Sequence, residues 1–443
     1  MPKGDNVMVL KRIVQIIAIV SVPLYFNATA EYSFTFDLTC FVLYSISSIA
    51  MLLNNCKTSL MKYEFFFTIA FLLTHFIYTT IYYNSDIAFI ISPDSFLPQF
   101  FNKGTALSLV GGAFFNLGVF DSKQANLSNT IVSKTKLYEP KFLLTILILA
   151  FLPFLYRLSG TGEYTTEFEN SLLNGILVCV IFYSLLANFN NSSSRGSIKK
   201  KIKGIATIPN GLILVYVLLF LRIGSRTLPL RIAFILLFLF DVFIVRFKKR
   251  DVIVASVIGL LLMAFIRFDR TGGSMAGISL INLGDDLIGC NRCLHYVMDY
   301  VSKNGFSYGL TLIITIISII PHGASVFMEL TGYTSSQLNS AAMITSVYGS
   351  ADQGGLGTTI IADLYLAFGF IGVLVFMYLL GLVVRKLYTG VCKGKISYIF
   401  LYALFIMDAV YINRSMYFVS ATFIAWSYFL YLIFSNFKIK KRT

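Results

Sequence analysis

The stretch TIIADLYLAFGFIGVLVFMYLLGLVV, residues 359–384, decides the fold. It contains a single charged side chain, Asp363, and about 20 apolar residues suffice to carry a helix across the hydrocarbon core of a membrane. The whole chain has the same character, since 57% of its 443 residues are hydrophobic, 13% are charged and the mean hydropathy is +0.76. This composition excludes a soluble globular protein and predicts an all-helical polytopic membrane protein.

The distribution of apolar residues predicts twelve membrane spans. The expected spans are residues 11–28, 33–53, 63–84, 100–120, 142–158, 171–188, 207–222, 229–246, 251–267, 359–384, 397–412 and 416–435. Because the chain shows neither an internal repeat nor a soluble domain, we expect residues 1–443 to form one transmembrane domain.

The positions of Lys and Arg predict the orientation, because cytoplasmic loops retain positive charge. When the N-terminus is placed in the cytoplasm, 26 of the 36 Lys and Arg residues fall in the two tails or in cytoplasmic loops. Both termini are therefore expected in the cytoplasm. The net charge of +15 then reflects membrane topology, and it does not indicate nucleic acid as a partner.

Residues 268–358 form the one long segment that we do not expect to cross the membrane. The segment carries many charged residues, and its only apolar run, residues 310–320, is too short to span a bilayer. A single crossing there would also turn the basic segment after residue 384 to the outside. We therefore expect an extracytoplasmic cap loop in which residues 310–320 form a re-entrant or surface-lying helix that ends at Pro321.

Five arginines are expected at the outer edge of the membrane. The stretch LRIGSRTLPLR, residues 221–231, carries Arg222, Arg226 and Arg231, and FIRFDRTGGS, residues 265–274, adds Arg267 and Arg270. A guanidinium group matches phosphate oxygens with two parallel hydrogen bonds, so such a cluster predicts a diphosphate-binding site. The alternative is that these side chains extend to lipid headgroup phosphates, and this alternative is strongest for Arg231.

Two residues of the cap and the following span are candidate catalytic groups. Asp363 lies in the first turns of a span, where an acid is costly without a function. It is expected either to pair with an arginine or to act as the base that activates a hydroxyl. His322 follows Pro321 and is a candidate base or phosphate ligand, with hydrogen bonding to a backbone carbonyl as the alternative.

The pattern CNRC places Cys290 and Cys293 close together in the cap. The spacing allows a local disulfide, but a zinc site would need two further ligands and only His295 lies nearby. The chain contains no G-x-x-x-x-G-K-[ST] motif, so the sequence does not indicate ATP hydrolysis.

The order of these features resembles the O-antigen polymerase (Wzy-type) family of oligosaccharide repeat-unit polymerases. The similarity covers roughly residues 215–380 and is carried by three stretches. They are LRIGSRTLPLR (221–231), NGFSYGLTLIITIISIIPHGAS (304–325) and GGLGTTIIADLYLAFGFIGVLVFMYLLG (354–381). The family often has Pro-Arg where this chain has Pro321-His322, so a phosphate-binding role transfers better to Arg226 than to His322.

The resemblance implies a bundle of about twelve transmembrane helices of the GT-C-like type in the bacterial inner (plasma) membrane. Such enzymes transfer a glycan from undecaprenyl diphosphate to another lipid-linked repeat unit on the outer face of the membrane. The implied partners are therefore the lipid-linked donor and acceptor, the bilayer and a chain-length regulator protein, and neither a cofactor nor a metal is implied.

Two other functions remain open on sequence alone. An O-antigen ligase shares the lipid-linked donor and the helical architecture, but it transfers the glycan to the lipid A core. A lipid-linked oligosaccharide flippase or another transporter also commonly has about twelve spans. Transporters tend to show related halves and a charged central cavity, whereas the halves of this chain are unlike and its charges collect at the outer edge.

Overall fold

The structure is a computed structural model that describes residues 3–83, 96–121, 167–191, 227–257, 285–349 and 356–436, together with positions 142, 145, 146, 148, 211 and 215. All regular secondary structure in these residues is helical, as the sequence predicts. The predicted spans at 142–158 and 207–222, and the second half of that at 251–267, lie almost entirely outside the described residues.

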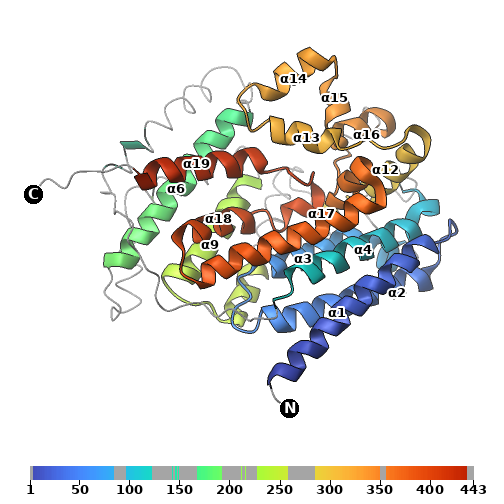
Figure 1. The fold of residues 1–443 in the computed structure, drawn as a ribbon, viewed down its shortest axis with the longest axis horizontal. Helices are drawn as coiled ribbons and strands as arrows, with labels where there is room; N and C mark the ends of the chain where they lie inside the picture. The colour runs from blue at the N-terminus through green and yellow to red at the C-terminus, as the bar shows by residue number, and fades with distance from the viewer. Residues whose placement is uncertain are drawn as a thin grey trace, which may run out of the picture.

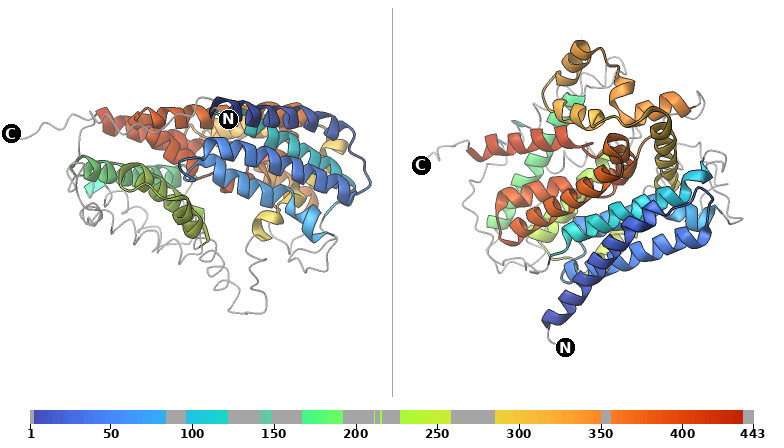
Figure 2. Two further views of the ribbon diagram at one scale, coloured as in Figure 1. Left: turned by 90° about the horizontal axis from the view of Figure 1, so that it is seen from below. Right: turned by 45° about the vertical axis from the view of Figure 1, so that its right-hand side comes forward.

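The longest helix of the bundle, α17, packs mainly against α4 and α18 (Figure 1). The bounds of the bundle helices are α1 Lys3–Phe26, α2 Phe34–Asn55, α3 Tyr63–His75, α4 Phe101–Val119, α6 Glu167–Asn191, α9 Thr227–Phe243, α17 Ile360–Cys392, α18 Ile396–Ile406 and α19 Ala421–Asn436. Helices α1, α2 and α4 pack together on one side of α17, and α18 on its other side continues to α9, α6 and α19 (Figures 1 and 2).

Three of these helices are long and apolar enough to cross a membrane: residues 6–26 of α1, α2 and α17. Shorter apolar helices accompany them, namely α3, residues 171–187 of α6, α18 and α19. The outer surface of α17 carries a row of exposed apolar side chains, Ile371, Val375, Leu379 and Val383, at intervals of one helical turn. A continuous apolar row of this kind suits contact with lipid chains.

Helices α4 and α17 approach each other most closely at two glycines. A Cβ atom on Gly118 would lie 2.4 Å from the carbonyl oxygen of Tyr378, and one on Gly381 would lie 2.5 Å from that of Phe115. Small residues at a helix crossing let two backbones touch, which compensates for the absence of a hydrophobic driving force within lipid. The two glycines therefore set the position of α17 against α4.

Six short helices form the cap at one end of the bundle (Figure 1). They are α11 Asp285–Ile288, α12 Asn291–Asn304, α13 Leu310–Ile317, α14 Gly323–Thr331, α15 Ser335–Leu338 and α16 Ser340–Tyr348. The predicted helix at 310–320 corresponds to α13, which ends four residues before Pro321. The ring of His295 in α12 packs against Phe101 at the start of α4, with centroids 4.8 Å apart, so the cap rests on that end of the bundle.

Asp299 ties two helices of the cap together. Its carboxylate accepts hydrogen bonds from Nζ of Lys303 and from the hydroxyl of Tyr348, both at 2.6 Å. Partial burial raises the pKa of Asp299, but the hydrogen bonds from Lys303 and Tyr348 outweigh it and hold that pKa below its ordinary value.

The last two predicted spans differ from the observed helices. Helix α18 ends at Ile406 and α19 begins at Ala421, whereas the sequence predicted apolar helices over 397–412 and 416–435. The segment between them, residues 407–420, contains Asp408, Asn413 and Arg414, and it folds as turns around the 3₁₀ helix Tyr411–Arg414. Asp408 and Ser420 of this segment bond to Arg231 of α9, and the hydroxyl of Tyr417 donates to the carbonyl of Phe376 in α17.

Candidate functional site

Helix α17 is broken near the cap. Phe368 and Gly369 leave the helical conformation, and Gly369 has φ +64° and ψ −149°, a region open essentially to glycine alone. The break separates a short segment, 360–367, from the long remainder of the helix. The carbonyl groups of Leu366 and Ala367 then accept hydrogen bonds from the backbone N–H groups of Ser307 (2.8 Å) and Gly309 (3.2 Å) in the cap.

Asp363 lies on this short segment and is fully buried. Its Oδ2 accepts a hydrogen bond of 2.9 Å from the backbone N–H of Tyr417, whereas Oδ1 has no hydrogen-bond partner. The hydroxyl groups of Thr311 in α13 and Ser340 in α16 are the side-chain donors nearest to the carboxyl group, but neither makes a well-aligned hydrogen bond with Oδ1. Asp363 thus occupies a buried polar cluster between the bundle and the cap.

This arrangement leaves one acidic oxygen available for chemistry. A carboxylate oxygen without a donor can accept a proton from a hydroxyl group that enters the site. Among the described residues Asp363 forms no ion pair, so the predicted pairing with an arginine is not seen there. The buried and unsatisfied hydroxyl of Thr311 adds a second polar atom that a bound molecule would satisfy.

Arg231 has a partner from a distant part of the chain. Its Nε lies 2.7 Å from Oδ1 of Asp408, its Nη2 donates to the hydroxyl of Ser420 at 2.8 Å, and its guanidinium stacks 4.8 Å from the ring centre of Tyr411. The sequence offered no acidic residue near Arg231, and the tertiary structure supplies one from the segment after α18. Arg231 therefore differs from the expected lipid-facing side chain.

A cavity of about 270 Å³ adjoins this ion pair. Asp408 and Ser420 contribute to its wall, and Tyr417 connects it with the Asp363 cluster, because Tyr417 lines the cavity while its backbone N–H bonds to Asp363. Most other lining residues are apolar; they include Leu380, Val383, Phe405, Ile412, Phe418 and Ile424. The cavity can thus hold an apolar chain whose polar end lies near Asp408 and Tyr417.

His322 does not join this cluster in the structure. It is exposed at the corner before α14, with φ +60°, and among the described residues no hydrogen bond or ion pair links it to Asp363. Tyr308, at the other end of α13, is the second non-glycine residue of the described chain with a left-handed backbone. Both residues lie on the exposed surface of the cap, where α13 is held to α19 by a 2.9 Å hydrogen bond from Trp426 Nε1 to the carbonyl of Ile319.

The remaining predicted arginines, Arg222, Arg226, Arg267 and Arg270, lie outside the described residues. Their convergence on one face therefore stays a prediction.

Two arginines that the sequence reasoning did not select approach the junction of cap and bundle. Arg292 of α12 and Arg414 of the 407–420 segment both lie within electrostatic reach of the Cys293 thiol. Nε of Arg292 is buried without a hydrogen-bond partner, and Arg414 is exposed. One arginine in a cap helix and one in the segment after α18 carry no sequence signal, so only the proximity of both to Cys293 identifies them.

The cysteine pattern of the cap has a structural role in the described residues. Cys293 forms no disulfide, and its Sγ donates a 2.8 Å hydrogen bond to the carbonyl of Leu356. Burial raises the pKa of the Cys293 thiol, so the thiolate needed for redox or metal chemistry is disfavoured. No group of three or more His, Cys, Asp or Glu side chains in the described part of the chain is placed to hold a metal ion.

The fold and site together define a helical protein with membrane-spanning candidates, a broken helix and a buried acid beneath a cap. Comparison of the chain with protein-family models, with curated proteins and with solved structures finds no match in any of the three.

Proposed function

We propose that the protein is a polysaccharide (O-antigen or capsule) polymerase of the O-antigen polymerase type. In this proposal the chain crosses the bacterial plasma membrane twelve times as a GT-C-like bundle, with both termini in the cytoplasm and the cap outside. The observation that carries the proposal is the fully buried Asp363, whose Oδ1 has no partner, on a short helical segment beneath the cap. An acid in a proposed membrane span, with no ion pair to any cation of the described residues, is a functional-site candidate on physical grounds.

The proposed reaction transfers the growing glycan to a lipid-linked acceptor. A hydroxyl oxygen of the acceptor sugar attacks the anomeric carbon of the donor, and the bond from that carbon to the diphosphate oxygen breaks. Asp363 accepts the hydroxyl proton, and undecaprenyl diphosphate leaves with the bonding electron pair. Arginine side chains stabilise the negative charge that develops on the departing diphosphate.

The geometry supports different roles for Arg231 and for the other arginines. Nε and Nη2 of Arg231 already bond to Asp408 and Ser420, which leaves Nη1 for a ligand. Arg226, with Arg222, Arg267 and Arg270, is proposed to provide the principal diphosphate contacts. The apolar cavity beside Asp408 is of a kind that accommodates part of a polyprenyl chain.

The exposed surface of the cap supports a place for the sugars. The ring of Tyr308 is 77% exposed beside α13, and aromatic faces stack on sugar rings. Its left-handed backbone, like that of His322, is a strained conformation of the kind that collects at functional sites. We place the glycan on this surface, with its reactive end toward Asp363.

A transporter is the second candidate, because two observations favour it. Broken helices at binding sites are typical of secondary transporters. In addition, His75 and His295 are fully buried near each other. Asp37 is also fully buried, beside the hydroxyl groups of Thr79 and Thr105, and it forms no ion pair with any described residue. Buried ionisable groups of this kind occur in proton relays of transporters.

A deletion strain separates the alternatives. Loss of a polymerase should leave single repeat units attached to the surface lipid, whereas loss of a ligase or a flippase should leave none. A flippase mutant should also retain lipid-linked units on the cytoplasmic side of the membrane. Surface glycans that keep their full length distribution in the deletion strain would refute the proposed function.

Complementation of the deletion strain tests the diphosphate site. Arg226→Ala should fail to restore polymer, and Arg226→Lys should also fail, because an ammonium group lacks the planar fork of guanidinium. Immunoblotting of membranes should show normal amounts of both variants. A full ladder of polymer lengths from Arg226→Ala would exclude this residue from the site.

A further inference from the structure

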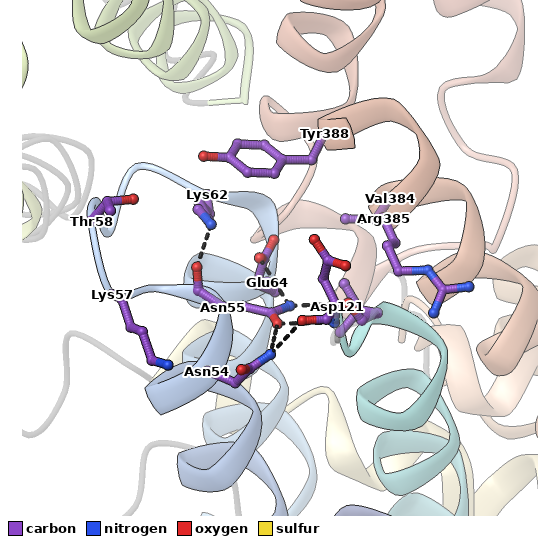
Figure 3. A pocket seen from close by; sticks show the side chains of 11 residues that line it. Asn54, Asn55, Lys57, Thr58, Lys62, Glu64, Asp121, Val384, Arg385 and Tyr388 are labelled. Carbon is purple, nitrogen blue, oxygen red and sulfur yellow. Dashed lines mark hydrogen bonds between the residues drawn. The ribbon is translucent and has the colours of Figure 1, made fainter. Parts of the chain in front are cut away.

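A second cavity, of about 110 Å³, lies at the end of the bundle away from the cap. The cap rests on the start of α4, which is 19 residues long. The cavity is lined by Val119 and Asp121, at the opposite end of this helix. The end of α2, the α2–α3 turn, the start of α3 and the last third of α17 complete the wall (Figure 3). If α2 and α17 span the bilayer, the cavity lies where the membrane meets water.

The framework of the cavity is held by two asparagines. Nδ2 of Asn55 donates to the carbonyl of Val119 at 3.0 Å, and its Oδ1 accepts from the backbone N–H of Asp121 at 3.1 Å. Nδ2 of Asn54 donates to the carbonyl of Asp121 at 2.7 Å. These bonds fix the end of α2 against the end of α4, so the cavity is shaped before any ligand binds.

Three cations and two anions face this space. Among the described lining residues the cations are Lys57, Lys62 and Arg385 and the anions are Glu64 and Asp121, a net charge of +1 for these five side chains. Nη1 of Arg385 donates to the carbonyl of Phe120 at 3.1 Å, and its other N–H groups remain for a ligand. Lys62 is only 5% exposed; its ammonium group donates to the carbonyl of Asn55 and lies 4.1 Å above the ring of Tyr388. An ammonium group has three donors, so a buried lysine held in this way retains donors for an anion.

Glu64 supplies the observation that points to a ligand. It is 2% exposed, and its Oε1 accepts a long hydrogen bond of 3.4 Å from Asn55, but its buried Oε2 has no hydrogen-bond partner. A buried carboxylate oxygen without a donor is costly, and it would be satisfied by a hydroxyl group of a bound molecule. The site therefore calls for a ligand that carries both a negative charge and a hydroxyl donor.

We propose that this cavity binds the headgroup of an anionic, hydroxyl-bearing phospholipid, represented by phosphatidylglycerol. The phosphate contacts Lys57, Lys62 and Arg385, and a glycerol hydroxyl donates to Oε2 of Glu64. Basic pockets between membrane helices are known to hold anionic headgroups, and a charge of −1 on the lipid complements the net charge of the cavity. This inference rests on the membrane-spanning arrangement proposed above but not on polymerase activity.

The test uses the purified full-length chain in a neutral detergent and native mass spectrometry with three short-chain lipids. Dioctanoyl phosphatidylglycerol is compared with dioctanoyl phosphatidylmethanol, which has the same charge but no hydroxyl, and with dioctanoyl phosphatidylcholine. The wild type should bind phosphatidylglycerol about tenfold more tightly than phosphatidylmethanol, because one hydrogen bond to a charged acceptor is at stake. Phosphatidylcholine should bind more weakly than either.

Three variants assign the effect to the cavity. Glu64→Gln should reduce the preference for phosphatidylglycerol over phosphatidylmethanol to about twofold, since a neutral amide is a weaker acceptor. Lys57→Gln should weaken the binding of both anionic lipids, and Lys57→Arg should restore wild-type affinity for them. Lys11→Gln, which removes an exposed lysine from α1, is the matched control and should change nothing.

Equal binding of phosphatidylglycerol and phosphatidylcholine by the wild type would overturn the proposal. An unchanged preference in Glu64→Gln would do the same, because the hydroxyl would then be recognised elsewhere. A further arm adds soluble glycerol 1-phosphate; if it binds as tightly as the lipid, the ligand is a soluble phosphate ester and the lipid assignment is wrong. Polymer length in cells is measured separately, so a failed lipid test leaves the proposed enzymatic function standing.

Discussion

Replacing Asp363 by Asn removes the proposed proton acceptor while preserving the local fold. Asn has almost the same shape as Asp, and its carbonyl oxygen can still accept the 2.9 Å hydrogen bond from the backbone N–H of Tyr417. The new amide nitrogen then takes the place of the unpartnered Oδ1, where the hydroxyls of Thr311 and Ser340 are near enough to accept from it. The substitution should therefore preserve the junction between α17 and the cap.

The expected effects on stability and on rate differ in size. Exchanging one charge-assisted hydrogen bond for a neutral one costs about 1 kcal/mol, and relief from burying a charge offsets part of it. Loss of a positioned general base lowers a rate by about 10²- to 10⁴-fold. Asp363→Asn should consequently be present in membranes at the wild-type level while its transfer rate falls at least a hundredfold.

The assay combines cells and purified protein. In the deletion strain, gel electrophoresis of surface glycans should show single repeat units with Asp363→Asn and a full ladder with the wild type. Purified protein supplied with a labelled lipid-linked repeat unit should give the same contrast in initial rate. Glu329→Gln, which alters an exposed acid of α14 in the cap, serves as the matched control and should retain the ladder. A full ladder from Asp363→Asn at normal expression would show that Asp363 is not the base.

Three further predictions follow from packing and charge. Asp408→Ala should lower the free energy of unfolding by about 3 kcal/mol, and with it the melting temperature in detergent, because it leaves the partly buried Arg231 unpaired. A variant with both residues changed to Leu should recover most of this stability. An unaltered melting temperature for Asp408→Ala would argue against the ion pair. Gly381→Ala should destabilise the protein by about 1–3 kcal/mol, because its Cβ would meet the backbone of α4. Gly211→Ala, which has no atom of the described residues within 4 Å of the added Cβ, should be neutral, and equal melting temperatures of the two variants would contradict the close crossing. Hydrogen bonding lowers the pKa of Asp299 in the folded state, so the contribution of Asp299 to stability is present above the unfolded pKa of about 3.9 and is lost as pH falls through the folded pKa. In thermal unfolding between pH 6 and 3, the wild type should therefore lose stability more steeply than Asp299→Asn. Parallel curves for the two proteins would exclude this linkage.

Much of the fold follows from residue patterns that act locally. Apolar runs such as 34–55 and 360–392 form helices because a backbone in lipid must satisfy its hydrogen bonds within the segment. The apolar run at 310–320 is too short to span a bilayer, and its helix, α13, has only 8 residues. The end of α18 could not be predicted in the same way, because its position depends on Asp408 reaching Arg231.

The candidate site also combines a residue that the sequence predicts with features that depend on the tertiary structure. Asp363 could be selected from the sequence, since a lone acid in an apolar stretch is costly wherever the stretch folds. The unpartnered oxygen of Asp363 could not be predicted from the sequence, because it depends on the positions of Tyr417, Thr311 and Ser340, which lie in three other parts of the chain. The cavity at Glu64 gave no sequence signal either, since its charges look like ordinary residues of loops and helix ends.

The sequence by itself determined the helical class, the membrane-spanning candidates and the choice of Asp363 as the acid of the candidate site. Each of these depends on the free energy of transferring a short segment from water to lipid, which is a property of that segment alone. Only the tertiary structure decided that α17 breaks at Gly369, that Arg231 pairs with Asp408, and that Glu64 keeps an unsatisfied oxygen. These features depend on distances between groups far apart in the chain, and such distances are set when the helices pack against one another.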